Sequence, residues 1–281
     1  MQPAHVVSST KKIMMKMIIL LKALSYFPHF WIRKLFFKKK INFNLVIIDM
    51  DGTFSKFHSF KEGLKLVYHD GAEKYNKVIL SEKKDNLSAD NLRMITGLRL
   101  LIHGKANRKS EIKLIVKSAE QVNPLLLKLT KKLSNDVEVI LATRSSDTVA
   151  KGLASEFNLG GGYGSVMKYD NNGTIVGAER LISDKIPAKS EFPFSTKEKV
   201  AQEHMEKKKK KFSLKNTIFI SNDILDIEVM SKSAYSILVR TNHHDFIDNI
   251  PYYLGLFDFV LRDENDLENL IKALSPKVIT K

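Results

Sequence analysis

The chain has 281 residues, of which 43% are hydrophobic and 27% are charged. This balance is typical of a globular protein with one sizeable core and excludes a disordered chain. There is no cysteine, which excludes disulfides, zinc–thiolate sites and cysteine nucleophiles and is compatible with a reducing compartment.

The net charge of +15 is concentrated in two places. Nine Lys or Arg residues and no acidic residue precede Asp49, and five lysines form the run 207–211. The rest of the chain is close to neutral. A nucleic-acid footprint would cover a whole binding face, so this distribution argues against general nucleic-acid binding. We expect the lysine run to be a solvated helix end or loop.

The first predicted element is the apolar, basic stretch 13–37 within the N-terminal segment 1–43. Lys16, Lys22 and Pro28 interrupt it, whereas a membrane-spanning helix needs roughly 20 predominantly apolar residues. Three lysines follow it in place of a small-residue cleavage site, which argues against a removable signal peptide.

Two main interpretations of this N-terminal segment stay open. In one, residues 11–40 form an in-plane anchor whose lysines bind the anionic surface of a membrane. In the other, the segment is a helix that packs on the protein's own core or on a second copy. A spanning helix is the least favoured interpretation. We expect a cytoplasmic protein, peripheral at the inner face of the membrane if the segment is an anchor.

The next predicted element is an apolar strand within residues 44–55, NLVIIDMDGTFS, which leads directly into two acids. A strand buried on both faces would bring Asp49 to the edge of a sheet, where a carboxylate needs a cation or strong donors. Strand alternation turns Asp49 and Asp51 to the same side. Mg²⁺ prefers such oxygen ligands, so the pair is a candidate metal and catalytic site. A plain Asp-Gly turn is the alternative.

Residues 57–133 carry apolar residues at helical spacing. We expect one helix to begin after Ser88, a second after Ser110, with these serines as N-caps, and a third to begin at Pro124. The pattern predicts a helical insertion after the first strand.

Strands and helices alternate in the remainder of the chain. We expect a strand at 137–142 ending at Thr143, a helix capped by Ser145 or Ser146 and ended by Gly160, a hairpin at 164–177 around Asn172-Gly173, a helix at 196–206, strands at 217–221, 236–239 and 257–261, and a C-terminal helix. Polar clusters follow the C-terminal ends of the strands. The sequence therefore predicts an α/β fold with a doubly wound parallel sheet and a site at those ends.

The motif DMDGTF after an apolar strand resembles motif one of the haloacid dehalogenase (HAD) superfamily of phosphohydrolases. Thr143 is similar to the phosphate-binding residue of motif two, and Lys197 to the lysine of motif three, with Lys199 as the fallback. The stretch 221–230, SNDILDIEVM, resembles the acidic motif four. The four motifs occur in the family's order over residues 44–261, which leaves out the N-terminal segment.

The resemblance implies a Rossmann-like HAD core at 44–60 and 136–281, with a helical C1 cap inserted at 61–135. The hairpin after motif two is similar to one in phosphoserine phosphatase-like members, which places the chain in that subgroup. The resemblance implies a Mg²⁺-dependent phosphatase that acts on a small phosphorylated substrate. In that reaction Asp49 is the nucleophile and forms an aspartyl-phosphate, and Asp51 is the general acid and base. Thr143 and Lys197 would bind phosphate oxygens.

Motif four departs from the family pattern. If Asp226 takes the second acidic place, Asn222 takes the first; alternatively Asp223 is the ligand in a loop that is one residue tighter. The implied metal ligands are therefore Asp49, Asp51 and a residue among Asn222, Asp223 and Asp226. An amide oxygen carries no charge, so an ion bound by Asn222 would be held more weakly.

Two alternative functions stay open. The chain could be a phosphotransferase of the same family, or a low-activity relative that binds a membrane or a partner protein. The substrate and the oligomeric state are not readable from the sequence. The candidate side chains for recognising an anion on the substrate are Arg93, Arg99, His103 and Arg108.

Overall fold

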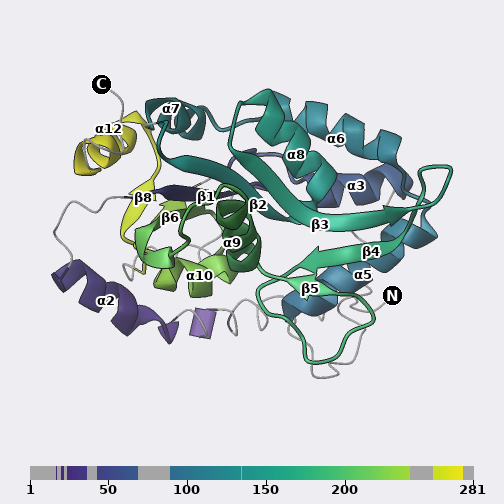
Figure 1. Ribbon diagram of the computed structural model, residues 1–281, viewed down its shortest axis with the longest axis horizontal. Coiled ribbons are helices and arrows are strands. Elements are labelled where there is room, and N and C mark those ends of the chain that lie inside the picture. Colours follow the sequence, from purple (N-terminus) through teal and green to yellow (C-terminus); the bar gives the residue numbers. More distant parts are fainter. Residues whose placement is uncertain are drawn as a thin grey trace, which may run out of the picture.

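The computed structural model describes residues 17, 20–21, 24–36, 43–68, 89–133, 135–240 and 256–274. An eight-stranded sheet with the order β5-β4-β3-β2-β1-β6-β7-β8 runs through them (Figure 1). All neighbouring strands are parallel except β3 and β4, which are antiparallel. The predicted α/β fold with a doubly wound, mainly parallel sheet is confirmed, and the predicted hairpin lies within the same sheet.

The strands are β1 (Leu45–Asp49), β2 (Glu138–Ser146), β3 (Gly161–Tyr169), β4 (Ile175–Ile182), β5 (Phe194–Ser195), β6 (Thr217–Ser221), β7 (Tyr235–Val239) and β8 (Phe259–Leu261). The helices are α2 (Phe27–Phe36), α3 (Ser59–Val67), α5 (Ala89–His103), α6 (Arg108–Glu120), α7 (Pro124–Lys132), α8 (Asp147–Glu156), α9 (Lys197–Lys207), α10 (Ile227–Lys232) and α12 (Glu264–Ala273). Two short 3-10 helices, η1 (Leu214–Asn216) and η2 (Ile224–Asp226), flank β6.

The central strand β1 is buried along its whole length because it has helices on both sides. Val46 and Ile48 point into one apolar cluster, and Leu45 and Ile47 point into another on the opposite face. Helices α6, α7, α8 and α12 supply the first cluster, and α2, α9 and α10 supply the second (Figure 1). A continuous aliphatic run fits a parallel strand buried on both faces. The strand therefore carries Asp49 from the core to the edge of the sheet.

Most predicted helix boundaries are confirmed, with local differences. Ser146 caps α8 and Pro124 is the first residue of α7, as expected. Ser110 is not the cap of α6: the side chain of Asn107 accepts a hydrogen bond from the Ser110 backbone N–H at 3.1 Å. Helix α8 ends at Glu156, before the predicted Gly160, and Asn158 in the following turn adopts a left-handed φ of 53°. The predicted cap Ser88 lies outside the described residues.

The strand expected at 137–142 is longer than predicted. It continues through Thr143 to Ser146, with an irregularity in its pairing to β3 between Ala142 and Ser146. The hairpin of β3 and β4 also extends beyond 164–177, and its turn places Gly173 at a φ of 76°. The lysine run 207–211 is exposed at and beyond the end of α9, as expected.

The helices between β1 and β2 pack in two different places. Helices α3 and α5 form a third apolar cluster with the hairpin, in which Leu64 and Leu98 meet Leu181. Helices α6 and α7 instead pack on the first cluster through Leu114 and Leu126. The predicted helical insertion is therefore present. Its first part packs apolar side chains on the hairpin, and α6 also contacts the hairpin, where Arg108 lies over the Tyr169 ring.

Part of the N-terminal segment packs on the core. Phe30 of α2 is fully buried, and the centroid of its ring lies 5.8 Å from that of Phe257. The neighbouring side chains Trp31 and Ile32 are 52% and 54% exposed. Among the described residues, no helix is long and apolar enough to cross a membrane. Helix α2 thus contacts the core on one side and presents apolar side chains on the other.

Candidate functional site

The candidate site forms where three neighbouring parallel strands end. Asp49 is the last residue of β1 and pairs in register with Ala142, so Thr143 follows at the same edge. On the other side of β1, Ile48 pairs with Ile220, which brings Ser221 to that edge. The sheet register alone therefore brings together motifs that are far apart in the sequence.

Asp49 is buried, with 4% of its surface exposed, and both of its carboxylate oxygens accept hydrogen bonds. Lys197 donates to Oδ1 through Nζ at 2.6 Å, and Thr53 donates to Oδ2 through Oγ1 at 3.0 Å. Burial raises the pKa of the Asp49 carboxyl, and the charge of Lys197 opposes that rise. The ammonium group is thus the main factor that favours the ionised, nucleophilic form of Asp49.

Lys197 is placed by the start of α9, where Thr196 is the N-cap. Its side chain is 4% exposed and also donates to Asp226 Oδ2 at 2.7 Å. Although burial alone would lower the pKa of Lys197, the charges of Asp226 and Asp49 raise it overall. Lys197 therefore stays protonated between two carboxylates. Lys199, the fallback for the motif-three lysine, is exposed.

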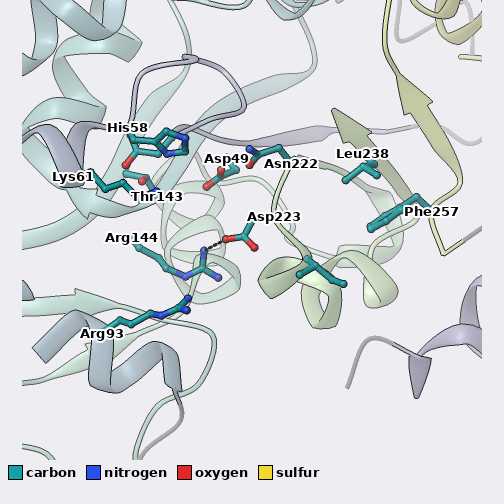
Figure 2. Close-up of a pocket in the computed structure, with 12 residues that line it drawn as sticks. Asp49, His58, Lys61, Arg93, Thr143, Arg144, Asn222, Asp223, Leu238 and Phe257 are labelled. Atoms are coloured by element: carbon teal, nitrogen blue, oxygen red, sulfur yellow. Dashed lines mark hydrogen bonds and ion pairs between the residues drawn. The ribbon is translucent and has the colours of Figure 1, made fainter. Parts of the chain in front are cut away.

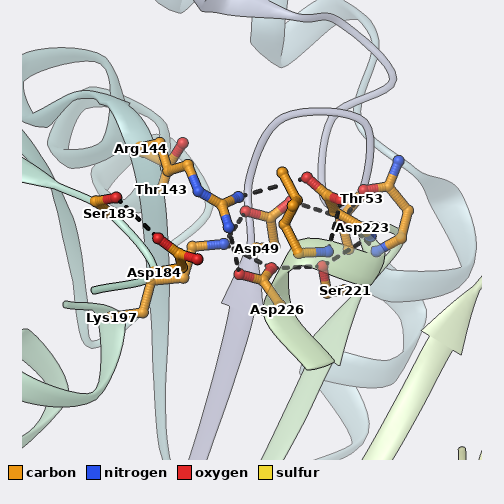
Figure 3. Close-up of polar contacts among 12 residues, drawn as sticks. Asp49, Thr53, Thr143, Arg144, Ser183, Asp184, Lys197, Ser221, Asp223 and Asp226 are labelled. Carbon is orange, nitrogen blue, oxygen red and sulfur yellow. Dashed lines mark hydrogen bonds and ion pairs between the residues drawn. The ribbon is translucent and has the colours of Figure 1, made fainter. Parts of the chain in front are cut away.

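Arg144 extends this group into an alternating row of charges, shown in Figure 3. Its Nη2 lies 3.2 Å from Asp226 Oδ1, and its Nη1 lies 3.4 Å from Asp223 Oδ2. We name the row Asp223–Arg144–Asp226–Lys197–Asp49 the charge row. Although burial alone would raise the pKa of Asp226, Lys197 and Arg144 lower it overall. The sequence prediction omitted Arg144, although its position next to Thr143 at a strand end could have indicated it.

Asp51 is held at the beginning of α3. Its Oδ1 accepts hydrogen bonds from the Ser59 backbone N–H at 3.1 Å and from Ser59 Oγ at 2.8 Å. The Ser59 hydroxyl also contacts Ser145 Oγ at 2.7 Å. Burial raises the pKa of Asp51 to about 6, and the charge of Asp49 adds to the rise while the Ser59 hydrogen bonds oppose it. A carboxyl group with this pKa can both give and accept a proton near neutral pH.

The turn that follows Asp51 packs closely against the motif-four loop. Gly52 has a φ of 79°, and a Cβ at this position would lie 2.5 Å from the Asn222 side chain. Thr53 Oγ1 accepts from the Asn222 backbone N–H at 2.9 Å, and it lies 2.9 Å from Asn222 Oδ1 and 3.0 Å from Asp49 Oδ2. A hydroxyl has one proton, so Thr53 can donate to only one of these oxygens at a time.

A cavity of about 330 Å³ opens over these groups (Figure 2). Asp49, Asp51 and Thr143 line one side of it. The other lining residues are His58, Lys61, Arg93, Arg144, Asn222, Asp223, Ile224, Leu238 and Phe257. Lys197 and Asp226 are not among the lining residues and lie behind Asp49 in the buried part of the charge row.

The four predicted anion-binding side chains differ in whether they reach the cavity. Arg93 of α5 lines it. The other three make contacts elsewhere. Arg99 pairs with Glu191 at 2.8 Å, the Arg108 guanidinium lies 5.0 Å from the centroid of the Tyr169 ring, and His103 Nδ1 contacts Tyr68 Oη at 2.7 Å. Arg93 is therefore the predicted side chain that the fold brings to the site.

The oxygen atoms around the cavity suit a hard divalent cation. Carboxylate oxygens of Asp49, Asp51 and Asp223 and the amide of Asn222 share the lining, and Mg²⁺ prefers such ligands. In the part of the chain that the structure describes, no group of three or more His, Cys, Asp or Glu side chains is arranged to hold an ion. Amide or backbone carbonyl oxygens would therefore have to complete the ligand set. Both Asp226 oxygens face cations instead.

No protein-family model matches the chain, and no curated protein is similar to it in sequence. Solved structures do match it. A phospho-aspartyl intermediate analogue of phosphoserine phosphatase is 14% identical, with a TM-score of 0.55, over 83% of this chain and 100% of that one. A phosphoserine phosphohydrolase-like protein from Francisella tularensis is 15% identical, with a TM-score of 0.55, over 82% of this chain and 99% of that one.

A HAD family hydrolase from Salmonella enterica serovar Typhi has a TM-score of 0.54 and 11% identity, over 78% of this chain and 72% of that chain. At such identities the likeness concerns the arrangement of the backbone. The chain therefore has a HAD fold of the phosphoserine phosphatase-like type.

Proposed function

We propose that the chain is a phosphomonoester phosphatase that acts through an aspartyl-phosphate on Asp49. The observation that carries this proposal is the pairing of two acids with different environments. Asp49 is buried against the Lys197 ammonium at 2.6 Å, whereas Asp51 faces the same cavity with its pKa raised to about 6. One group is suited to attack phosphorus and the other to move a proton.

In the first step, a carboxylate oxygen of Asp49 attacks phosphorus and forms a P–O bond. The bond from phosphorus to the ester oxygen breaks, and that oxygen leaves with the electron pair and takes the proton of Asp51. Thr143 lines the cavity beside Asp49, and its hydroxyl would donate a hydrogen bond to the phosphoryl group. Lys197 balances the charge of Asp49 before the attack.

In the second step, water attacks the phosphorus of the aspartyl-phosphate. Asp51, now ionised, accepts the water proton, and the P–O bond to Asp49 breaks with its electron pair returning to the carboxylate. The Ser59 hydrogen bonds to Asp51 Oδ1 fix the orientation of the carboxyl group for these transfers. Phosphate is released, and both acids return to their starting protonation states.

The proposed cofactor is Mg²⁺, held by Asp49 and Asp51 together with Asn222 or Asp223. When bound, this ion would neutralise negative charge on the phosphoryl oxygens. Asp226 was also a candidate ligand, but its contacts with Lys197 and Arg144 favour a structural role in the charge row.

We propose that the insertion 61–135 provides a C1 cap over a small phosphorylated substrate, and that α3 and α5 form this cap. Lys61 of α3 and Arg93 of α5 support this, because they bring positive charge to the cavity from the insertion. The contacts of α6 and α7 with the first apolar cluster favour counting those two helices with the core.

We also propose that the N-terminal segment binds an anionic membrane surface from the cytoplasmic side. The support is the exposed pair Trp31 and Ile32 on α2, in a segment that has nine basic residues and no acid before Asp49. Phe30 would hold α2 on the core while the exposed side faces the lipid.

The nucleophile is tested with two isosteric substitutions. Asp49→Asn keeps the shape but removes the attacking charge, so hydrolysis of both aryl and alkyl phosphates should be abolished. Asp51→Asn should slow turnover by about 10²–10⁴-fold, and it should affect alkyl phosphates more because an aryl leaving group needs little protonation. A hydroxylamine-labile phosphoryl adduct on Asp49 should be detectable by mass spectrometry. Substantial activity in folded Asp49→Asn would place the nucleophile elsewhere or favour a non-catalytic protein.

The raised pKa of Asp51 has a consequence for stability with a definite sign. The folded state binds this proton more tightly than the unfolded chain does, so stability contributed by Asp51 is present below pH 3.8 and is lost as the pH rises through about 6. Asp51→Asn removes this titration while its amide oxygen can still accept from Ser59. The unfolding free energy of Asp51→Asn relative to wild type, measured by urea denaturation, should therefore increase between pH 4 and 7. A flat difference over that range would mean that Asp51 has an ordinary pKa.

The metal proposal is tested at motif four. A chelator should abolish hydrolysis of an aryl phosphate, and added Mg²⁺ should restore it. Asn222→Asp should tighten Mg²⁺ binding, measured by isothermal titration calorimetry, because it adds a charged ligand. Asp223→Asn should weaken binding if Asp223 is the ligand and leave it unchanged if Asn222 is. Full activity in the chelator would remove Mg²⁺ from the proposal.

The membrane proposal is tested with vesicles of phosphatidylglycerol and phosphatidylcholine. The full chain should sediment with them, and less so at high salt because the lysine charges are screened. The double substitution Trp31→Ser and Ile32→Ser should reduce sedimentation and leave hydrolysis of small phosphates intact. Ile112→Ser is the matched control, since Ile112 on α6 is 54% exposed. Equal sedimentation of both variants and wild type would exclude α2 as the contact.

A further inference from the structure

Arg144 is a partly buried cation at the site that the reaction outlined above does not use. Its side chain is 16% exposed, lines the cavity with Asp49 and Asp51, and directly follows Thr143. Its contacts with Asp223 and Asp226 measure 3.4 Å and 3.2 Å. The contacts of Lys197 in the same row measure 2.6 Å and 2.7 Å. Charge-assisted hydrogen bonds are normally shorter than 3 Å, so Arg144 is the less tightly engaged of the two cations.

The partners of Arg144 also differ in their setting. Asp226 is 3% exposed and is held additionally by Lys197 and by Ser221 Oγ at 2.7 Å. Asp223 is 36% exposed and lines the cavity, and its Oδ1 accepts from the Leu225 backbone N–H. The guanidinium is therefore fixed at its inner end by Asp226, while its outer end meets a carboxylate at the cavity wall (Figure 3).

The charges at the site suggest a function for the end of the Arg144 guanidinium that contacts Asp223. The charge row holds three carboxylates and two cations, so its net charge is negative. Cations at the cavity wall, among them Lys61, Arg93 and Arg144, must offset this charge when a phosphate dianion binds. Asn222 contributes no charge to an ion at the position where the family resemblance implies an acid. Arg144 is a cation that lines the cavity beside Asp49 and can compensate for this.

We infer that Arg144 is a further catalytic residue, whose guanidinium leaves Asp223 and donates to two oxygens of the transferring phosphoryl group. Asp223 would hold the guanidinium in place until the substrate arrives. The planar fork of an arginine matches two phosphoryl oxygens at once, which a lysine ammonium cannot do. This inference rests on the proposed phosphatase function, because it assigns a role within the same reaction.

A purely structural Arg144 is the competing interpretation. In that case the side chain only neutralises Asp223 and Asp226 and positions Asp226 for Lys197. Its loss would then lower stability or turnover without a specific effect on phosphate binding. The two roles therefore differ in the affinity for an anion and not only in the rate.

The first experiment measures binding of inorganic phosphate by isothermal titration calorimetry, with and without Mg²⁺. Arg144→Gln should weaken phosphate binding about 10–100-fold, the cost of losing a charged hydrogen-bonding partner. Arg144→Lys should recover part of this loss because it restores the charge without the fork. Arg180→Gln is the matched control, since Arg180 is 24% exposed and pairs with Glu203 at 2.8 Å outside the cavity. It should bind phosphate as wild type does.

A second variant keeps the inference falsifiable if Arg144→Gln folds poorly. Asp223→Asn removes the carboxylate that competes with phosphate for the guanidinium, so metal-free phosphate binding should become several-fold tighter. Because Asp223→Asn also removes a negative charge from the cavity wall, it is compared with the same substitution in an Arg144→Lys background. The gain should be smaller there; an equal gain would mean that Arg144 is only structural, and the inference would be wrong. Wild-type affinity in folded Arg144→Gln would also overturn it while leaving the phosphatase proposal standing. A wild-type protein that neither binds phosphate nor hydrolyses an aryl phosphate would instead overturn the proposed function itself.

Discussion

The site depends on one buried ammonium group held between two buried carboxylates. Moving a single ion into a protein interior costs several kcal/mol even after relaxation, so Lys197 cannot be buried without Asp49 and Asp226. Removing one partner of such a group typically costs about 3–5 kcal/mol. The end of β1, the start of α9 and the turn after β6 must therefore converge on one point. The parallel register of β1 with β2 and β6 makes this convergence a property of the sheet.

This constraint also explains why the chain turns sharply after Asp49. Asp49 is paired with Lys197, which does not line the cavity, so Asp51 has to reach the cavity only two residues later. Gly52 permits that turn because it adopts a positive φ and because it has no Cβ, which would clash with the Asn222 side chain. Thr53 then returns to Asp49 and joins it to the motif-four loop through a single hydroxyl. The two acids consequently receive different environments: Asp49 contacts an ammonium group, whereas Asp51 lies between Ser59 and the cavity.

The sequence predicted the parts of this arrangement that are encoded locally. The aliphatic run before Asp49, the strand at 217–221 and the N-terminal end of α9 at Lys197 all carry strong local signals, and the structure places them as expected. The parts that it could not predict depend on contacts between distant segments. The extension of β2 through Thr143 follows from pairing with β3, and Ser59 becomes a partner of Asp51 only through the folded turn. A single sequence shows neither pairing.

Arg144 combines both cases: its position next to Thr143 could have indicated a site residue, but a single sequence does not show that it meets the motif-four acids. It stands at the end of β2, and the two carboxylates that it contacts belong to η2 and the turn before it. The order of strands β2, β1 and β6 alone brings these segments to opposite sides of Asp49. The same reasoning applies to Arg93, which reaches the cavity because α5 packs on the hairpin of β3 and β4.

The acidic edge and the basic wall of the cavity therefore come from different packing layers. Asp49, Thr143 and Lys197 are fixed by the central sheet and its two apolar clusters. Arg93 instead depends on the third cluster, where α3 and α5 meet the hairpin. Changes in that third cluster can alter which anions reach the cavity without disturbing the ion pairs behind Asp49. Such a separation would allow one fold to keep the proposed phosphoryl-transfer groups while the substrate changes.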